Sequence, residues 1–334
     1  MKTNIKFLLV ALVAFSAFSI TSCSEDDPAP TPTPAPQTIA QIAQGNPNLS
    51  ILVEALTKAG LVNTLNSAGT YTVFAPDNAA FTAANITSDY IAAQTTPQQI
   101  DDLRNVLLNH VISTKLTAAQ LTTGYKKTLA APAALPTEKM NIYVSNTADG
   151  VILNGISEVM SPNIEASNGV IHLVDAVITL PSIVTFVAAD PNFSSLLAAV
   201  TRPDQASENF DGILSGTTSS PFTVFAPTNS AFTSLLEELT LGSLADVPTA
   251  TLTRTLKYHV VVGDNVLSTD LTNNQDVDTF LGTGTNESFT IEILAATGAQ
   301  IRDSSNRVSK ITATDVQANN GIVHVIDKVL LAAN

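Results

Sequence analysis

The stretch TVFAPDNAAF, residues 72–81, returns later in the chain as TVFAPTNSAF, residues 223–232, with only two of its ten positions changed. Solenoid repeats have periods of about 20 to 50 residues, so a repeat distance of about 150 residues indicates two whole domains in tandem. The size of the chain fits that reading, because its 334 residues suit two domains of ordinary length. The sequence therefore predicts a duplicated scaffold to which these ten residues belong.

Within this stretch, the order of residue types predicts a strand, a corner and the start of a helix. The alternation over residues 72–75 is typical of a short strand, and Pro76 ends it because proline has no N–H for the ladder. Asp77 or Asn78 can then cap a helix that starts at residue 79 and places Phe81 on its inner face. The second copy keeps the same order of residue types.

The second repeated segment is LLNHVIS at residues 107–113, which returns as LKYHVVV at residues 256–262. Apolar residues spaced three or four apart predict a helix over residues 97–113, and the same pattern recurs over residues 251–261. In both helices the histidine falls on the apolar stripe and is expected to face the core.

The third repeated segment is NGVIHLVDAVI at residues 168–178, which returns as NGIVHVIDKVL at residues 320–330. The Asn-Gly pair predicts a tight turn, and the nearly continuous apolar residues after it predict a strand buried on both faces. One histidine lies in this strand in each copy, so all four histidines of the chain belong to repeated segments.

Together the three segments resemble the signature boxes of the fasciclin (FAS1) domain family, over residues 38–181 and again over residues 182–334. The resemblance implies an α+β fold in which each domain is a wedge-shaped, mostly antiparallel β-sandwich with packed helices. It also implies a secreted or surface-anchored protein, since many members act in adhesion. The motif residues that it marks, expected to be mostly structural, are Thr72, Phe74, Pro76, Asn78, Phe81, His110, Asn168, Gly169, His172, Asp175, Thr223, Phe225, Pro227, Asn229, Phe232, Tyr258, His259, Asn320, Gly321, His324 and Asp327.

The first copy departs from the family pattern at two positions. Asn109 precedes the histidine where the second copy has Tyr258, and Asn163 stands where the second copy has the acidic Asp315. The integrin-directed peptides of animal members are not reproduced, so the resemblance does not extend to an integrin partner.

The residues offer no constellation for catalysis or metal binding. Zinc needs three or four close ligands, whereas each copy has two distant histidines and no cysteine. We expect each histidine to be bonded to a backbone carbonyl or to a corner residue (Asp77 or Asn78, Thr228 or Asn229), with metal or ligand binding as the alternative. The segment 276–278, Asp-Val-Asp, resembles a calcium loop without its glycine and distal glutamate and is expected to be a solvated turn. The sequence thus predicts no enzyme, no metal site and no cofactor.

The N-terminus predicts an export signal. Residues 7–20 are uninterruptedly apolar, but they are too few to cross a bilayer of about 30 Å. The tetrapeptide that ends at Cys23 resembles a bacterial lipobox, which makes residues 1–22 the signal peptide and Cys23 the lipidated N-terminus; a plain secretory signal is the alternative. Residues 23–37 form a Pro/Thr-rich linker, in which alternating prolines favour extended polyproline II.

The segment Ser24-Glu25-Asp26-Asp27 resembles the acidic tetrads that mark surface-exported lipoproteins in Bacteroidetes. It predicts an outer-membrane lipoprotein exposed on the cell surface, with a periplasm-facing protein as the alternative. The formal net charge is −14, from 15 Lys+Arg and 29 Asp+Glu, which excludes nucleic acid as a partner because its phosphates would be repelled.

Two functions are consistent with these features. The first is a non-enzymatic, surface-anchored adhesion protein that contacts a cell-surface or extracellular-matrix protein or polysaccharide, or a biofilm polymer, with homophilic association left open. The alternative is a glycan- or small-ligand-binding accessory lipoprotein of a surface uptake system. That alternative predicts a concave pocket with aromatic side chains, and the chain has five Tyr and no Trp.

Overall fold

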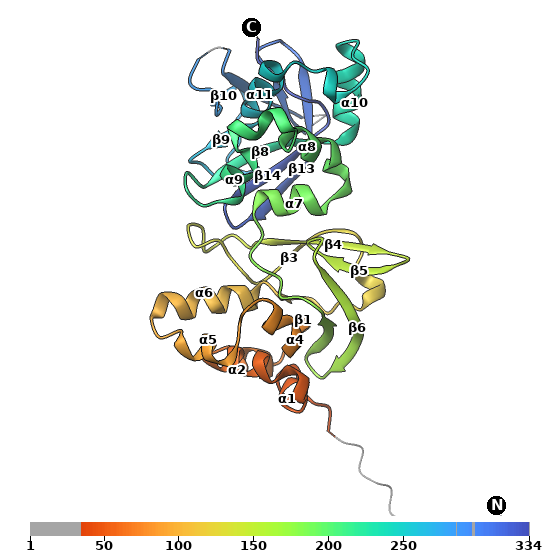
Figure 1. Ribbon diagram of the computed structural model, residues 1–334, viewed down its shortest axis with the longest axis vertical. Coiled ribbons are helices and arrows are strands. Elements are labelled where there is room, and N and C mark those ends of the chain that lie inside the picture. Colours follow the sequence, from red (N-terminus) through yellow and green to blue (C-terminus); the bar gives the residue numbers. More distant parts are fainter. Residues whose placement is uncertain (1–34, 285, 296–297, 334) are drawn as a thin grey trace, which may run out of the picture. The chain divides into compact units, whose positions relative to one another are not determined.

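The computed structural model describes residues 35–284, 286–295 and 298–333. From Pro36 onward the chain forms one compact unit (Figure 1). Residues 38–181 are called domain 1 and residues 182–334 domain 2 below. The predicted signal peptide, the lipidation site Cys23 and nearly all of the linker lie outside the described residues.

Domain 1 is built on a seven-stranded sheet with the strand order β2-β1-β7-β6-β5-β4-β3. Its strands are β1 (Tyr71–Pro76), β2 (Val111–Ile112), β3 (Gly124–Lys127), β4 (Asn141–Thr147), β5 (Gly150–Leu153), β6 (Ser157–Ala166) and β7 (Gly169–Val174). Its helices are α1 (Ile39–Gln44), α2 (Ser50–Lys58), α3 (Val62–Asn66), α4 (Asn78–Ala83), α5 (Ser88–Ala93) and α6 (Pro97–Leu108), with short 3-10 turns η1 (Pro47–Leu49) and η2 (Ala118–Gln120).

Domain 2 repeats this plan with the order β10-β11-β12-β13-β14-β8-β9. Its strands are β8 (Phe222–Pro227), β9 (Val260–Val262), β10 (Gln275–Asp278), β11 (Ser288–Leu294), β12 (Gly298–Arg302), β13 (Val308–Ala318) and β14 (Gly321–Ile326). Its helices are α7 (Ile183–Ala189), α8 (Ser194–Val200), α9 (Phe210–Ser215), α10 (Asn229–Glu238) and α11 (Thr249–Tyr258), with 3-10 segments η3 (Pro191–Phe193), η4 (Pro203–Glu208) and η5 (Leu244–Asp246).

Both sheets are antiparallel except at one pairing, which is the second from one edge of the sheet. β1 runs parallel to β7 and β8 runs parallel to β14, while the other pairs are antiparallel. The predicted α+β class and the two tandem domains are therefore confirmed, each domain having a seven-stranded sheet with packed helices.

Each domain has two apolar cores, one on each side of the sheet. In domain 1 the helices cover one face of β1 and β7 with Leu56, Phe81 and Leu103, while Phe74 and Ile142 belong to the core on the other face. The sheet reaches around this second core because β6 carries two register shifts, which bend a strand and increase its twist.

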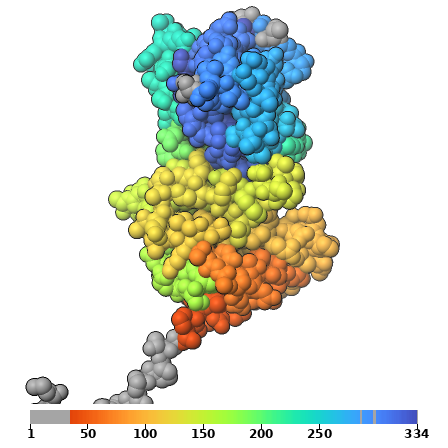
Figure 2. All heavy atoms as spheres, turned by 180° about the vertical axis from the view of Figure 1, so that it is seen from behind, coloured from red at the N-terminus to blue at the C-terminus, as the bar shows by residue number. Residues whose placement is uncertain are grey.

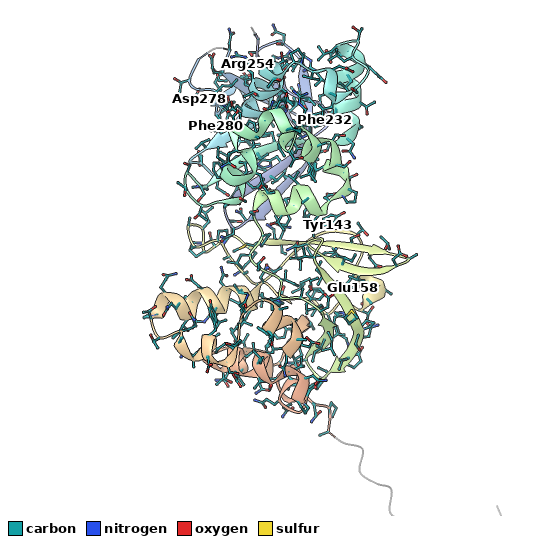
Figure 3. The ribbon with its side chains drawn as sticks, in the orientation of Figure 1. Tyr143, Glu158, Phe232, Arg254, Asp278 and Phe280 are labelled. Atoms are coloured by element: carbon teal, nitrogen blue, oxygen red, sulfur yellow. The ribbon has the colours of Figure 1, made fainter. Side chains whose placement is uncertain are left out.

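The strand, corner and helix predicted from residues 72–81 are present. β1 ends at Pro76, and Asp77 caps α4 by accepting a hydrogen bond from the Ala80 N–H at 2.8 Å. The helix starts at Asn78, one residue earlier than predicted, because Asp77 is the cap. Phe81 is buried, as is its equivalent Phe232 on α10, which is labelled in Figure 3.

The two predicted histidine helices end earlier than the apolar spacing indicated. α6 stops at Leu108 instead of continuing to residue 113, and α11 spans Thr249–Tyr258 instead of residues 251–261. The residues that follow form the short strands β2 and β9, which pair with β1 and β8. Sheet pairing therefore overrides the helical periodicity at both places.

The acidic segment 276–278 lies in β10, so the predicted solvated turn is wrong there. Its ladder partners on β11 are Thr290, Phe289 and Ser288. Across the described part of the chain no helix is long and apolar enough to span a membrane, and only Ile183–Ala189 and Pro191–Val200, bent by 97° at their junction, meet the criterion as a pair.

Candidate functional site

The histidine just after the long helix in each domain joins that helix to the last segment of the domain. His110 Nδ1 donates to the Val106 carbonyl at 2.8 Å, and Nε2 accepts from the Ile178 N–H at 2.9 Å. This assignment is forced, because a backbone N–H can only donate and Nε2 must therefore be unprotonated. His259 makes the equivalent two bonds at 2.7 and 2.9 Å.

Both rings are buried and uncharged. Burial lowers the pKa of His110 and of His259 to about 4, against an ordinary value of 6.5, because the imidazolium form loses its hydration. With both ring nitrogens occupied, neither histidine is free to bind a ligand. One partner is the expected backbone carbonyl, but the other is a backbone N–H, and the corner residues are not involved.

The second histidine of each domain lies on the last strand, β7 or β14, and bonds to the segment that follows β2 or β9. His172 Nε2 donates to the Leu116 carbonyl at 2.9 Å, and His324 Nε2 donates to the Val266 carbonyl at 2.8 Å. Each ring stacks on the phenylalanine of the repeated strand, at centroid distances of 5.7 Å in domain 1 and 5.3 Å in domain 2. Burial lowers the pKa of both rings.

The Asn-Gly pair holds the first helix of each domain against the sheet. Asn168 Oδ1 accepts from the Ile39 N–H at 2.9 Å, and its Nδ2 donates to the carbonyls of Leu65 and Ser67. A Cβ on Gly169 would lie 2.1 Å from the Tyr71 carbonyl oxygen, so only glycine fits there. Asn320 and Gly321 repeat this arrangement in domain 2.

The corner asparagine links its helix to the preceding helix pair. Asn78 Oδ1 accepts from the Ile51 N–H at 3.0 Å, and its Nδ2 donates to the Pro47 carbonyl. Asn229 does the same in domain 2, at 2.9 and 2.8 Å. The amide at this position therefore holds the 3-10 turn and the helix after it.

The remaining polar motif residues are also bonded within the fold. Thr72 Oγ1 donates to the Thr114 carbonyl and Thr223 Oγ1 to the Asp264 carbonyl. Asp175 accepts from the Glu158 N–H, and Asp327 from the Lys310 N–H, both at 2.7 Å.

The structure accounts for both departures from the family pattern. The hydroxyl of Tyr258 donates to the Ser288 carbonyl at 2.7 Å, whereas Asn109 donates to the Thr179 carbonyl at 3.0 Å. Asn163 and Asp315 both have left-handed backbone, with φ of 63° and 61°, which Asn and Asp tolerate. Each also accepts a hydrogen bond from a backbone N–H, so the amide and the acid do the same structural work.

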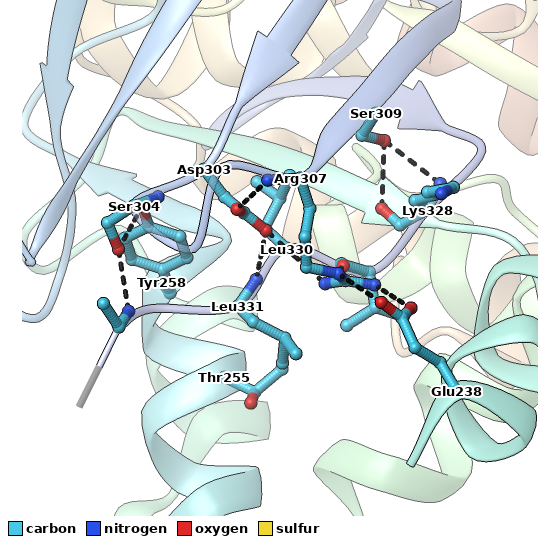
Figure 4. Close-up of polar contacts among 12 residues, drawn as sticks. Glu238, Thr255, Tyr258, Asp303, Ser304, Arg307, Ser309, Lys328, Leu330 and Leu331 are labelled. Atoms are coloured by element: carbon cyan, nitrogen blue, oxygen red, sulfur yellow. Dashed lines mark hydrogen bonds and ion pairs between the residues drawn. The ribbon is translucent and has the colours of Figure 1, made fainter.

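A partly buried ion-pair cluster closes the C-terminal side of domain 2 (Figure 4). Arg307 donates to Glu238 at 2.7 Å, to the Val329 carbonyl at 2.7 Å and to Asp303 at 3.4 Å. Asp303 also accepts from the Leu331 N–H at 2.9 Å. The cluster fixes the last segment of the chain, and its charges are paired inside the fold.

The motif residues therefore form a scaffold in the part of the chain that the structure describes. Among these residues, no three His, Cys, Asp or Glu side chains come together in a group that could hold a metal ion. Candidate contacts with other molecules must be sought on exposed surfaces, where the two copies differ.

The clearest difference is an apolar patch on domain 1, formed by Ile152, Ile156 and Met160, which are 37%, 57% and 64% exposed. Ile152 is opposite Glu158 on the neighbouring strand, and Met160 lies two residues further along, so they share a face of the β5–β6 hairpin. No sequence motif marked these residues, although the strand alternation over residues 157–161 would have placed Met160 outward.

Domain 2 exposes Ile293 and Leu294, at 41% and 45%, and it also has a polar depression. The depression has a volume of about 510 Å³ and is lined by Asp276, Asp278, Thr290, Arg302 and Ser304, among others. Its one aromatic lining residue, Phe289, is 1% exposed and belongs to the core. The depression therefore offers hydrogen-bonding groups without an aromatic stacking surface.

These features define a protein of two tandem domains, in which the same fold is built twice and the motif residues are bonded within it. A family model described as the fasciclin domain matches residues 47–181 and 191–332, and the chain belongs to this family. The structure of a FAS1 domain pair from the insect cell adhesion molecule fasciclin I matches with a TM-score of 0.52 and 19% identity, over 86% of this chain and 98% of that one.

Similar curated proteins come from bacteria and animals. Protein sll1483 of Synechocystis is 38% identical over 144 residues, which is 43% of this chain and 74% of that protein. Human periostin is 29% identical over 270 residues, which is 79% of this chain and 28% of periostin. The chain likewise spans only 35% of the pig transforming growth factor-beta-induced protein ig-h3.

Proposed function

We propose that the protein is a non-enzymatic, surface-anchored adhesion protein that makes cell–cell, cell–matrix or biofilm–polymer contacts through its FAS1 domains. The observation that carries the proposal is that the motif residues and the exposed surface residues have different roles. The repeated polar residues are bonded internally, while the exposed apolar patch of domain 1 is formed by residues outside the repeated motifs. The similar fold of a domain pair from an insect cell adhesion molecule supports this function.

The patch suits a protein or polysaccharide partner with an apolar face. Exposed apolar side chains that cluster on one face mark interaction sites more often than scattered ones do. The equivalent of Met160 in domain 2 is Thr312, counted from the histidine of the last repeated strand. Domain 2 therefore provides a matched control position within the same chain.

Anchoring is a separate part of the proposal and rests on the N-terminal sequence. Lipidation at Cys23 would hold the protein at the outer membrane, and the acidic segment Ser24–Asp27 supports exposure on the cell surface over a periplasmic orientation. Metabolic labelling with a fatty acid tests lipidation: the label should be lost in Cys23→Ser. Protease treatment of intact cells should then remove the wild-type protein, and full protection would place it on the periplasmic side.

The binding experiment uses the purified chain from residue 24 onward on an array of matrix proteins, cell-surface proteins and polysaccharides. Saturable binding to one class is expected, with at least a tenfold loss of affinity in Met160→Lys and none in Thr312→Lys. Self-association abolished by Met160→Lys would identify homophilic adhesion. Equal binding by both variants would remove the patch from the proposal, and silence toward every partner, itself included, would refute adhesion.

The polar depression of domain 2 favours a second candidate, a glycan- or small-ligand-binding accessory lipoprotein of an uptake system. Arg302 and the two aspartates could bond hydroxyl groups of a sugar or another polar ligand. A panel of sugars and small metabolites should then raise the Tm of the wild-type chain but not of Arg302→Ala. The absence of any shift would eliminate this candidate.

A further inference from the structure

Two tyrosines of domain 1 meet one carboxylate of domain 2. The Tyr125 hydroxyl donates to Asp190 Oδ2 at 3.0 Å, and the Tyr143 hydroxyl lies 3.3 Å from Asp190 Oδ1. Asp190 is 5% exposed and Tyr143 3% exposed, so the contact is shielded from water. Charge-assisted hydrogen bonds of this kind are the strong ones, and they are strengthened further in a low-dielectric environment.

The carboxylate is already held in place within its own domain. Asp190 caps η3 by accepting from the Asn192 N–H at 3.0 Å, directly after the end of α7. No cation pairs with Asp190 among the residues that the structure describes. Its negative charge is therefore stabilised by hydrogen-bond donors alone, two of which come from the other domain.

Aromatic packing surrounds these hydrogen bonds. The Tyr125 ring lies 5.1 Å from the Tyr143 ring and 5.4 Å from Phe186 of α7, in an edge-to-face arrangement with the latter. Tyr143, labelled in Figure 3, belongs to the apolar core of domain 2 although it lies on β4 of domain 1. The contact thus combines a buried apolar surface with directional polar bonds.

A second group of contacts lies on β13 of domain 2. Asn141 accepts from the buried Gln317 N–H at 2.8 Å, and Lys127 Nζ donates to the Asp315 carbonyl at 3.1 Å. In Figure 2 the yellow segment of domain 1 lies directly against the blue C-terminal strands. Contacts to both α7 and β13 oppose rotation about the short join between the domains, which one contact alone would permit.

Each domain has both the edge-strand pair and the capping position that form this contact, so one copy of each surface is left free. The residues of the free copies differ from those in the contact. In domain 1, Tyr125 on the edge strand β3 is opposite Tyr143 on β4. The equivalent opposed pair in domain 2 is Asp276 on the edge strand β10 and Thr290 on β11. The capping position of Asp190 is occupied by Asn46 in domain 1. The free surfaces therefore lack both the tyrosine pair and the acceptor carboxylate.

We propose that Asp190 and the Tyr125–Tyr143 pair lock the two domains into one rigid body, and that this contact forms within one chain and not between chains. The domains then present their exposed surfaces at one fixed spacing and angle. The free β10–β11 face of domain 2 and the free Asn46 cap of domain 1 lack the residues that make this contact. The chain therefore does not extend head to tail into filaments by the same contact. This inference does not depend on what the surfaces bind.

The test measures the distance between two spin labels in the chain from residue 24 onward. Cys23 is the only cysteine, so this chain has no competing thiol, and Ser88→Cys on α5 with Ser234→Cys on α10 places one label at an exposed site in each domain. We expect one narrow distance distribution for the parent and a broad one for Tyr125→Phe/Tyr143→Phe and for Asp190→Ala. Asn46→Ala removes the equivalent cap in domain 1 and should leave the distribution narrow.

Circular dichroism of each variant separates loss of the lock from loss of folding. A broad distribution in the parent, or a narrow one in the folded tyrosine variant, would overturn the lock. Light scattering tests closure within the chain: a monomer at all concentrations is expected. Head-to-tail oligomers that require Asn46 and Thr290 would contradict it.

Discussion

Acidification should unfold this protein through the two histidines that follow the long helices. In the folded state His110 and His259 have a pKa of about 4, while an unfolded histidine has a pKa of about 6.5. The folded-state pKa is lowered, so the stabilisation is fully present above pH 6.5 and is lost as the pH falls towards 4. Protonation would also turn Nε2 into a donor facing the Ile178 or Leu330 N–H.

The size of the effect follows from the two pKa values. Each histidine should reduce the free energy of unfolding by about 2.5 kcal/mol at pH 4.5 but by only about 0.2 kcal/mol at pH 7. Two such groups give a loss of about 5 kcal/mol over this range, a large part of the stability of an ordinary domain. His172 and His324 act in the same direction, because burial lowers their pKa as well.

Urea unfolding at several pH values between 7 and 4.5, followed by far-ultraviolet circular dichroism, measures this loss. The chain has no Trp, so fluorescence is a weak probe. The matched variant is His110→Gln/His259→Gln, which lacks both titrating rings and should show a mean slope smaller by about 2 kcal/mol per pH unit over this range. An unchanged slope in this variant, or a flat profile for the wild type, would refute the reasoning.

Three further predictions concern single side chains and are measured by urea unfolding at pH 7. Gly169→Ala should cost about 2 kcal/mol or more because its Cβ would press on the Tyr71 carbonyl, whereas Gly45→Ala should be close to neutral; equal effects would contradict the close approach. Arg307→Met should cost about 3 kcal/mol by leaving buried Asp303 without its cation, and a loss below about 1 kcal/mol would show that the backbone donors suffice. Thr223→Val should cost about 1 to 3 kcal/mol by leaving the Val266 N–H unpaired, and a neutral result would mean that water replaces the hydroxyl.

The duplicated strand, corner and helix could be predicted because their determinants are local. Pro76 ends the strand and Asp77 caps the helix within a few residues of each other, and the second copy repeats both features. The ends of α6 and α11 could not be predicted in this way. There the decisive interaction is the pairing of β2 with β1, which lie far apart in the sequence.

Part of the site was visible in the sequence and part was not. The spacing placed His110 and His259 on the buried side of a helix, but it could not reveal that Ile178 and Leu330 donate to them. The solvated turn predicted for segment 276–278 is wrong because this polar segment forms an edge strand, where one face is solvated.

The contact between the domains left no local signal at all. Tyr125, Tyr143 and Asp190 come from three separate segments and belong to no repeated motif. They become visible only when the strand register aligns the two copies and shows where they differ.

The central claim is that the repeated motifs build the scaffold and that exposed, unrepeated residues make the contacts. Attachment of cells that produce the wild-type protein, Met160→Lys or Thr312→Lys tests it most directly, with surface amounts matched by antibody. The account predicts attachment for the wild type and for Thr312→Lys, and attachment near that of a deletion strain for Met160→Lys. Equal attachment by all of these strains, the deletion included, would contradict it.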